Sequence, residues 1–180
     1  MDHAAAEEIA RFWKSAGPAR WFDKDADFDR RFRDAFLSSH LAAARRELDH
    51  WQSSADGSLA LLILVDQFPR NAFRGSAHMY AIDPLARHFA RRAHEAAQMR
   101  QVEPELRVFF CLPFAHSEAM ADQDRSLELH LELGEPWLSH ARDHREIIRR
   151  FGRFPHRNAV LGRETTPQEQ AFLDGGGFAG

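Results

Sequence analysis

Residues 27–51 read DFDRRFRDAFLSSHLAAARRELDHW, and their apolar side chains return at the spacing of one helical face. The members of this face are three or four residues apart in most steps: Phe28, Phe32, Phe36, Leu37, Leu41, Ala44, Leu48 and Trp51. Such a stripe predicts one long amphipathic helix over residues 27–51, whose apolar side packs against other helices.

The rest of the chain carries start and stop signals of further helices. The apolar run LALLILV at residues 59–65 has no second strand-like segment to pair with, so we expect a central helix buried on all sides. Caps and leading prolines predict the other helices at residues 5–15, 84–99, 104–113, 117–133, 136–151 and 166–173. The prediction is an all-α fold: a single domain over residues 1–180 of about eight antiparallel helices, with a loose tail at 174–180.

Composition narrows the class of protein. A length of 180 residues suits one domain, and a net charge of -3 argues against a general nucleic-acid binder. The single cysteine, Cys111, cannot form an intramolecular disulfide and suits a reducing compartment. The N-terminus lacks the pattern of a secretory signal, and the longest apolar run is too short to span a bilayer. We therefore expect a cytoplasmic protein with no membrane contact.

Three polar segments depart from the helical pattern, each at an expected helix boundary. They are DQFPRNAFRG at residues 66–75, LPFAHSE at 112–118 and RFPHRNAVLGR at 153–163. If successive helices alternate in direction, the third, fifth and seventh end at one face of the bundle. The expectation is one polar patch made of Asp66, Arg70, Asn71, Arg74, His116, Ser117, Glu118, Arg153, His156, Arg157 and Asn158.

Asp66 is the most informative residue of this patch. It is expected in the last turn of an apolar helix, where the helix dipole and the apolar surroundings both disfavour a negative charge. We predict that it pairs with an arginine, which is Arg70, Arg74 or an arginine of the third segment. Such a network can be purely structural, tying loops together. Alternatively, the arginines and a helix N-terminus bind an anion.

Three functional hypotheses remain open from the residues alone. The leading one is a binding protein for a small anionic ligand or the end of a peptide, through Arg70, Asn71, Arg74, His116, Ser117, Arg153, His156, Arg157 and Asn158. The second is a hydrolase in which Asp66 or Glu118 orients His116 as a general base, although no residue stands out as a nucleophile. The third is a protein-interaction scaffold whose polar patch is structural. Whether the protein is an enzyme is left undecided.

Metal and cofactor sites are not expected. His140 and His144 are four residues apart on one helix, a spacing that can place two imidazoles on one metal, but no third ligand lies nearby. The glycines of the tail follow no strand and so are no phosphate loop. The helix that carries Phe28, Phe32 and Phe36 offers a face to a second copy of the chain, so a homodimer is also an expectation.

Three motifs together resemble the signature of domain-of-unknown-function family 924. They are DQFPRN at residues 66–71, LPFAHSE at 112–118 and RFGRFPHRN at 150–158. The resemblance covers nearly the whole chain. It implies a bacterial protein with an all-helical fold similar to the tetratricopeptide-repeat-like superfamily. It implies no established activity and supplies no catalytic residues.

Overall fold

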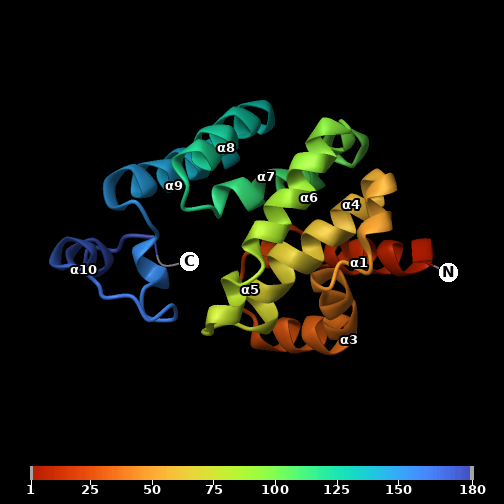
Figure 1. Cartoon of the computed structure of the whole chain (residues 1–180), viewed down its shortest axis with the longest axis horizontal. Coiled ribbons are helices and arrows are strands. Elements are labelled where there is room, and N and C mark those ends of the chain that lie inside the picture. The colour runs from red at the N-terminus through yellow and green to blue at the C-terminus, as the bar shows by residue number, and fades with distance from the viewer. Residues whose placement is uncertain (1, 179–180) are drawn as a thin grey trace. The chain divides into compact units, whose positions relative to one another are not determined.

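The computed structural model describes the backbone of residues 2–178 and the side chains of residues 5–178 (Figure 1). Within these residues the chain forms helices and turns and no strand, so the predicted all-α class is confirmed. None of the described helices is both long and apolar enough to cross a membrane. The tetratricopeptide-repeat-like character stays a prediction.

The chain divides into two compact units. Unit 1 runs to Arg74 and resumes over His78–Pro113, and unit 2 comprises Gly75–Ala77 and the chain from Phe114 onward. Each unit is described by itself, and the expectation of a single domain over residues 1–180 stays a prediction.

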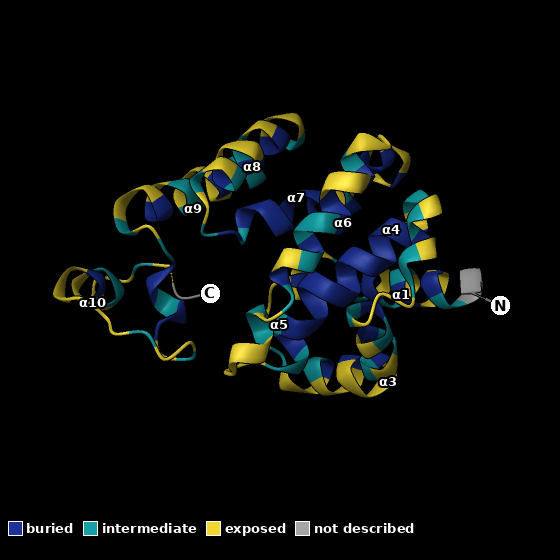
Figure 2. Cartoon of the chain, viewed as in Figure 1, coloured by how far each residue is buried: buried dark blue, intermediate teal, exposed yellow. Residues whose placement is uncertain are grey.

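Unit 1 is built around a buried central helix. Its helices are α1 (Asp2–Ala16), α2 (Pro18–Trp21), α3 (Ala26–Ala44), α4 (Ala55–Leu62), α5 (Phe68–Ala72), α6 (Asp83–Glu95) and the first part of α7 (Val108–Ala115). Short 3₁₀ turns lie at Asp49–Ser53, Ala77–Tyr80, Gln98–Gln101 and Pro104–Leu106. Helix α4 packs against α1 and α6, and α5 packs against α3. Figure 2 shows α4 buried from Gly57 to its end at Leu62, as the apolar run predicted, while its first two residues are not buried.

The start of α4 depends on a glycine. Ser54 caps the helix by accepting a hydrogen bond from the Gly57 N–H at 3.1 Å. A Cβ atom on Gly57 would lie 2.1 Å from the carbonyl oxygen of Trp51, far inside contact distance. The preceding turn can therefore approach α4 this closely only because residue 57 has no side chain.

The predicted long helix is too long by several residues. Helix α3 ends at Ala44, and Arg46 adopts a left-handed backbone with φ 65°. A 3₁₀ turn at Asp49–Ser53 then carries Trp51 into the core, where it is 4% exposed. The apolar spacing of three to four residues continues through both kinds of helix, so the pattern did not mark the change.

The expected end of the central helix at Asp66 is also wrong. Helix α4 continues through a π-helical turn at Ile63–Gln67 into α5. In this turn the Phe68 N–H donates to the carbonyl of Ile63, five residues back. The carbonyl of Leu64, which an α-helix would pair with Phe68, accepts from His40 Nδ1 at 2.9 Å instead. A π-turn has no sequence signature, and such turns are frequent at functional sites.

Three further boundaries differ from the sequence-based expectation. Helix α6 ends at Glu95 rather than residue 99, because Ala97 has a left-handed backbone with φ 52°. Helix α7 does not stop at Pro113 but includes it and continues to Ala115, since this short helix is apolar and held by packing. Helix α8 begins at Met120, three residues after the predicted start at 117.

Unit 2 contains a helix pair and a small satellite core. Helices α8 (Met120–Leu133) and α9 (Trp137–Phe151) fold back on each other, and α10 (Pro167–Asp174) follows a 3₁₀ turn at Pro155–Arg157 (Figure 1). The core comprises Ile147, Ile148 and Phe154, with Met120, Phe151 and Phe172 packed against them. The predicted capping box of α10 is confirmed, with Thr166 as the cap and Glu169 as its partner.

Candidate functional site

The first polar segment forms a buried ion-pair network in unit 1. Arg70 Nη1 lies 3.3 Å from Asp66 Oδ1, and its Nη2 donates to Asp83 Oδ2 at 3.0 Å. Gln67 Nε2 donates to Asp66 Oδ2 at 2.6 Å. The predicted pairing of Asp66 with an arginine is confirmed, and a second carboxylate, that of Asp83, also engages Arg70.

The other members of this segment join α5 to α3. Asn71 Nδ2 donates to Asp29 Oδ1 at 2.7 Å, and Arg74 Nε donates to Asp29 Oδ2 at 2.9 Å. Asp29 lies on α3, so one carboxylate receives both side chains. These contacts stabilise the packing of α5 and use the polar groups that were expected to bind an anion.

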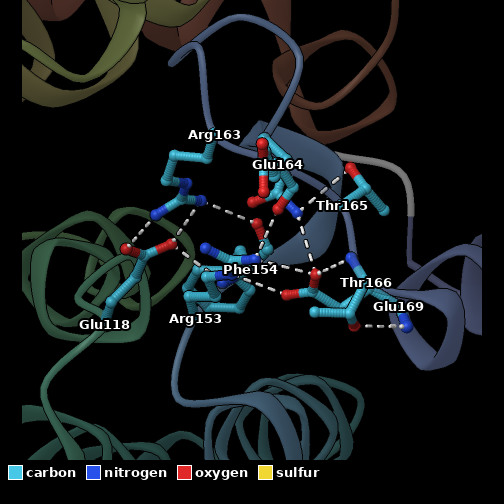
Figure 3. Close-up of polar contacts among 9 residues, drawn as sticks. Glu118, Arg153, Phe154, Arg163, Glu164, Thr165, Thr166 and Glu169 are labelled. Atoms are coloured by element: carbon cyan, nitrogen blue, oxygen red, sulfur yellow. Dashed lines mark hydrogen bonds and ion pairs between the residues drawn. The ribbon is translucent and has the colours of Figure 1, made fainter.

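In unit 2, Glu118 connects the second and third segments (Figure 3). Its Oε1 accepts from the Phe154 N–H at 2.8 Å, and its Oε2 accepts from Arg163 Nη1 at 2.8 Å. Burial acts to raise the pKa of Glu118, but the hydrogen bonds from Arg163 and Phe154 outweigh it and lower the pKa below its ordinary value. Glu118 is thus an ionised carboxylate that fixes a loop.

A second carboxylate engages Arg153 (Figure 3). Arg153 donates from Nε and Nη2 to the two carboxylate oxygens of Glu169, at 2.6 and 2.8 Å. The hydrogen bonds from Arg153 lower the pKa of Glu169 to about 2. Asn158 Nδ2 donates to the same carboxylate at 3.3 Å. Arg153 and Asn158, both expected to bind a ligand, therefore hold α10 to the loop before it.

Ser117 has a different role from the one predicted. It does not cap α8, whose first residue is Met120. Its hydroxyl donates to Asp122 Oδ2 at 2.7 Å and accepts from the Ala119 N–H at 3.2 Å. The hydroxyl thus closes the turn that precedes the helix, and the helix begins three residues after the expected position.

Arg157 lies next to an aromatic ring. Its Nη2 donates to the carbonyl oxygen of His116 at 2.9 Å, and its Cζ lies 4.6 Å from the centre of the Phe154 ring. A carbonyl and a ring face attract a cation but carry no net charge. These two neighbours help to hold the guanidinium in place.

Four rings gather beside Arg157, and we call them the ring cluster: His144, Phe154, His156 and Phe178. The centre of the Phe178 ring lies 4.6 Å from that of His144 and 5.0 Å from that of His156, both edge to face. Phe154 lies 5.5 Å from His144 and 5.6 Å from His156. Helix α9 supplies His144, the third polar segment supplies Phe154 and His156, and the glycine-rich tail supplies Phe178.

Both imidazoles of the ring cluster have an unsatisfied nitrogen. The Nδ1 atoms of His144 and His156 are buried and have no hydrogen-bond partner among residues 2–178. Burial, together with the positive fields of His116 and Arg157, lowers the pKa of His144 to about 3. Burial and Arg157 also lower the pKa of His156 to about 3, against an opposing effect of Glu118. Both rings are neutral at pH 7.

This arrangement is suited to an anion. A buried polar atom without a hydrogen bond costs about 1–3 kcal/mol, so each such atom in a native structure calls for a partner. A protonated imidazole donates from both nitrogens, but the nearby positive charges oppose protonation. A negatively charged ligand would favour protonation of the imidazoles and accept hydrogen bonds from their N–H groups.

The predicted binding residues therefore divide into two groups. Six make structural contacts within their own unit: Arg70, Asn71 and Arg74 in unit 1, and Ser117, Arg153 and Asn158 in unit 2. Glu118, the catalytic candidate of unit 2, is engaged in the same way. His156 lies in the ring cluster, and Arg157 and His116 lie beside it. The segments come from different units, so the idea of one common patch stays a prediction.

Sequence reasoning missed three members of the ring cluster. Phe154 lies within the third polar segment but was not among the predicted site residues. His144 was considered only as half of a metal pair with His140; no group of three or more metal-ligating side chains occurs among the described residues. Phe178 lies in a tail that was expected to be loose. A usable signal was the aromatic residue directly after three glycines, at 175–177.

Comparisons with known proteins agree with the helical fold and give no activity. A family model described as bacterial protein of unknown function (DUF924) matches residues 9–177. A solved structure of a protein of unknown function from Agrobacterium tumefaciens is similar to this chain, with a TM-score of 0.96 and 56% identity. The match covers 97% of this chain and 99% of that one. No curated protein matches.

Proposed function

Because the chain belongs to the DUF924 family of bacterial proteins of unknown function, we propose a function from geometry alone: unit 2 binds a small anion at the ring cluster. Arg157 supplies the fixed positive charge, and His144 and His156 supply hydrogen-bond donors after they take up protons. The observation that carries the proposal is the pair of buried Nδ1 atoms without hydrogen bonds.

The proposal has an electrostatic basis. A negative charge about 4 Å from an imidazolium stabilises it by about 4 kcal/mol at the effective dielectric constant near a protein surface. This free energy corresponds to roughly a thousandfold change in the protonation equilibrium. The bound anion would therefore allow His144 and His156 to take up protons in mildly acidic solution, near pH 6, although the pKa of each is about 3 without it.

Calorimetry with inorganic phosphate tests the proposal. We expect phosphate to bind near pH 6 with net uptake of protons, measured by repeating the titration in buffers of different ionisation enthalpy. For each proton taken up, the affinity rises by about tenfold as the pH falls by one unit. The variants His144→Gln and His156→Gln should each reduce the proton uptake, because glutamine cannot be protonated.

Arg149→Gln is the matched control for Arg157→Lys. Arg149 is an arginine of α9 with 61% of its side chain exposed, and it pairs with Glu146 on the same helix. The control should bind phosphate as the wild type does, whereas the Arg157→Lys variant should bind it more weakly because the planar donor fork is lost. Binding that is unaffected by Arg157→Lys and by both histidine variants would refute the proposal.

The alternative functions also stay proposals. A hydrolase would need Asp66 or Glu118 to orient His116, and the carboxylate of Glu118 is already engaged by Arg163 and the Phe154 N–H. This engagement favours binding over general-base catalysis. A scaffold role, a homodimer and a cytoplasmic location have no observation in unit 2 that favours them, and they remain expectations from the sequence.

A further inference from the structure

The glycine-rich tail is built to fold back onto α10. Gly176 has φ +80°, a backbone conformation that other residues rarely adopt. A Cβ atom on Gly177 would lie 2.6 Å from the ring and from the carbonyl oxygen of Phe172, so this position has no room for a side chain. The Gly177 N–H donates to that carbonyl at 2.9 Å. Both glycines thus direct the chain toward the ring cluster.

The fold-back places Phe178 against the two histidines. Its ring meets His144 at 4.6 Å and His156 at 5.0 Å, with interplanar angles of 62° and 83°. Phe178 nevertheless remains 41% exposed, so it covers the cluster from one side without being enclosed. Its attachment consists of ring contacts and a short glycine turn, which a competing ring can replace.

Phe178 contacts the aromatic rings of the site but not its buried polar atoms. Its ring meets the edges and faces of the imidazoles, but it has no polar atom for the buried Nδ1 atoms of His144 and His156. The guanidinium of Arg157 lies beside the same cluster, with its Cζ 4.6 Å from the centre of the Phe154 ring. A ligand with both a ring and an anionic group would satisfy the aromatic and the polar parts together.

We propose that the ligand of unit 2 is an aromatic anion, whose ring takes the place of Phe178 while its anionic group meets Arg157 and the two histidines. This inference rests on the proposed anion-binding function. The tail then acts as a placeholder that the ligand displaces. Phe178 makes two edge-to-face ring pairs with the histidines. Together these pairs favour the folded-back tail over the displaced tail by about tenfold.

The test compares inorganic phosphate with phenyl phosphate, which carry the same anionic group with and without a ring. In the Phe178→Ala variant we expect phenyl phosphate to bind about tenfold more tightly than in the wild type, because the competing ring is gone. Inorganic phosphate, which does not need the place of the ring, should change by less than about twofold. Gly177→Ala should have the same effect, since its Cβ atom is incompatible with the fold-back.

Gln168→Ala is the control, since this side chain is exposed on α10 and lies outside the ring cluster. If inorganic phosphate binds through Arg157 but phenyl phosphate binds no more tightly in Phe178→Ala, the aromatic class is wrong while the anion site stands. An equal gain in affinity for both ligands would also overturn the inference. Phe178 would then block access to the site without occupying a position that recognises an aromatic ring. If neither ligand binds the wild type or either tail variant, the proposed function fails and the inference with it.

Discussion

Removing the two buried imidazoles should make the protein less sensitive to acid. The perturbation is the double substitution His144→Gln and His156→Gln. In the folded protein the pKa of each histidine is lowered to about 3, whereas in the unfolded chain it returns to the ordinary value of 6.5. A folded-state pKa below the unfolded one means that the unfolded chain takes up protons first, so stability is lost as the pH falls below 6.5.

The size of the stability loss follows from the difference between the folded and unfolded pKa values. One pH unit below 6.5, the unfolded histidine is mostly protonated and the folded one is still neutral. Each histidine then removes about 1.4 kcal/mol of unfolding free energy between pH 7.5 and 5.5, and the pair removes roughly 2–3 kcal/mol. Burial also lowers the pKa values of His40 and His130, so some pH dependence will remain in the variant.

Urea unfolding followed by tryptophan fluorescence measures the effect at both pH values, in buffers without phosphate. The wild type should lose about 2–3 kcal/mol more than the double variant between pH 7.5 and 5.5. Adding phosphate at the lower pH should recover part of the loss in the wild type only, because the ligand binds the folded state. An equal loss in both proteins would refute the reasoning, since the two imidazoles would then not be buried and neutral.

Three further predictions concern the framework, and urea unfolding measures each. Arg70→Ala should cost about 3–5 kcal/mol, because Asp66 loses its cationic partner while staying buried; a cost below about 1 kcal/mol would show that the pair is exposed. Gly57→Ala should cost more than about 1 kcal/mol, since its Cβ would meet the Trp51 carbonyl at 2.1 Å, and a neutral result would contradict that approach. Thr166→Ala should cost about 1 kcal/mol and Thr166→Ser little, and equal losses would argue against the cap.

Local sequence rules predicted the features that depend on neighbouring residues. The capping box of Thr166 and Glu169 spans three residues, and the pairing of Asp66 with Arg70 spans four. Both could be predicted because an α-helical turn brings such positions together. The buried α4 was also predictable, because its side chains are apolar on every face.

The errors arose where tertiary packing decided the backbone. The π-turn at Ile63–Gln67 and the left-handed turn at Arg46 occur inside an uninterrupted apolar pattern, so no local residue marked them. The proline rule failed at Pro113 because the surrounding helix is held by burial.

The candidate site was predicted only in part for the same reason. His156 and Arg157 were chosen from a polar motif, and both belong at or beside the ring cluster. His144 and Phe178 reach it from segments far apart in the sequence, with 33 residues between them. The ionic partners of the other predicted residues were equally remote, as with Arg74 and Asp29. Which carboxylate each arginine engages depends on where the carboxylates lie in space.

The most direct test of the central claim is the protonation state of His144 and His156, observed by NMR of the histidine ring nitrogens near pH 6 with and without phosphate. Both rings should be neutral in the free protein and should become protonated as phosphate saturates the site. Rings that stay neutral at saturating phosphate, or that are already protonated without it, would contradict an anion site at the ring cluster.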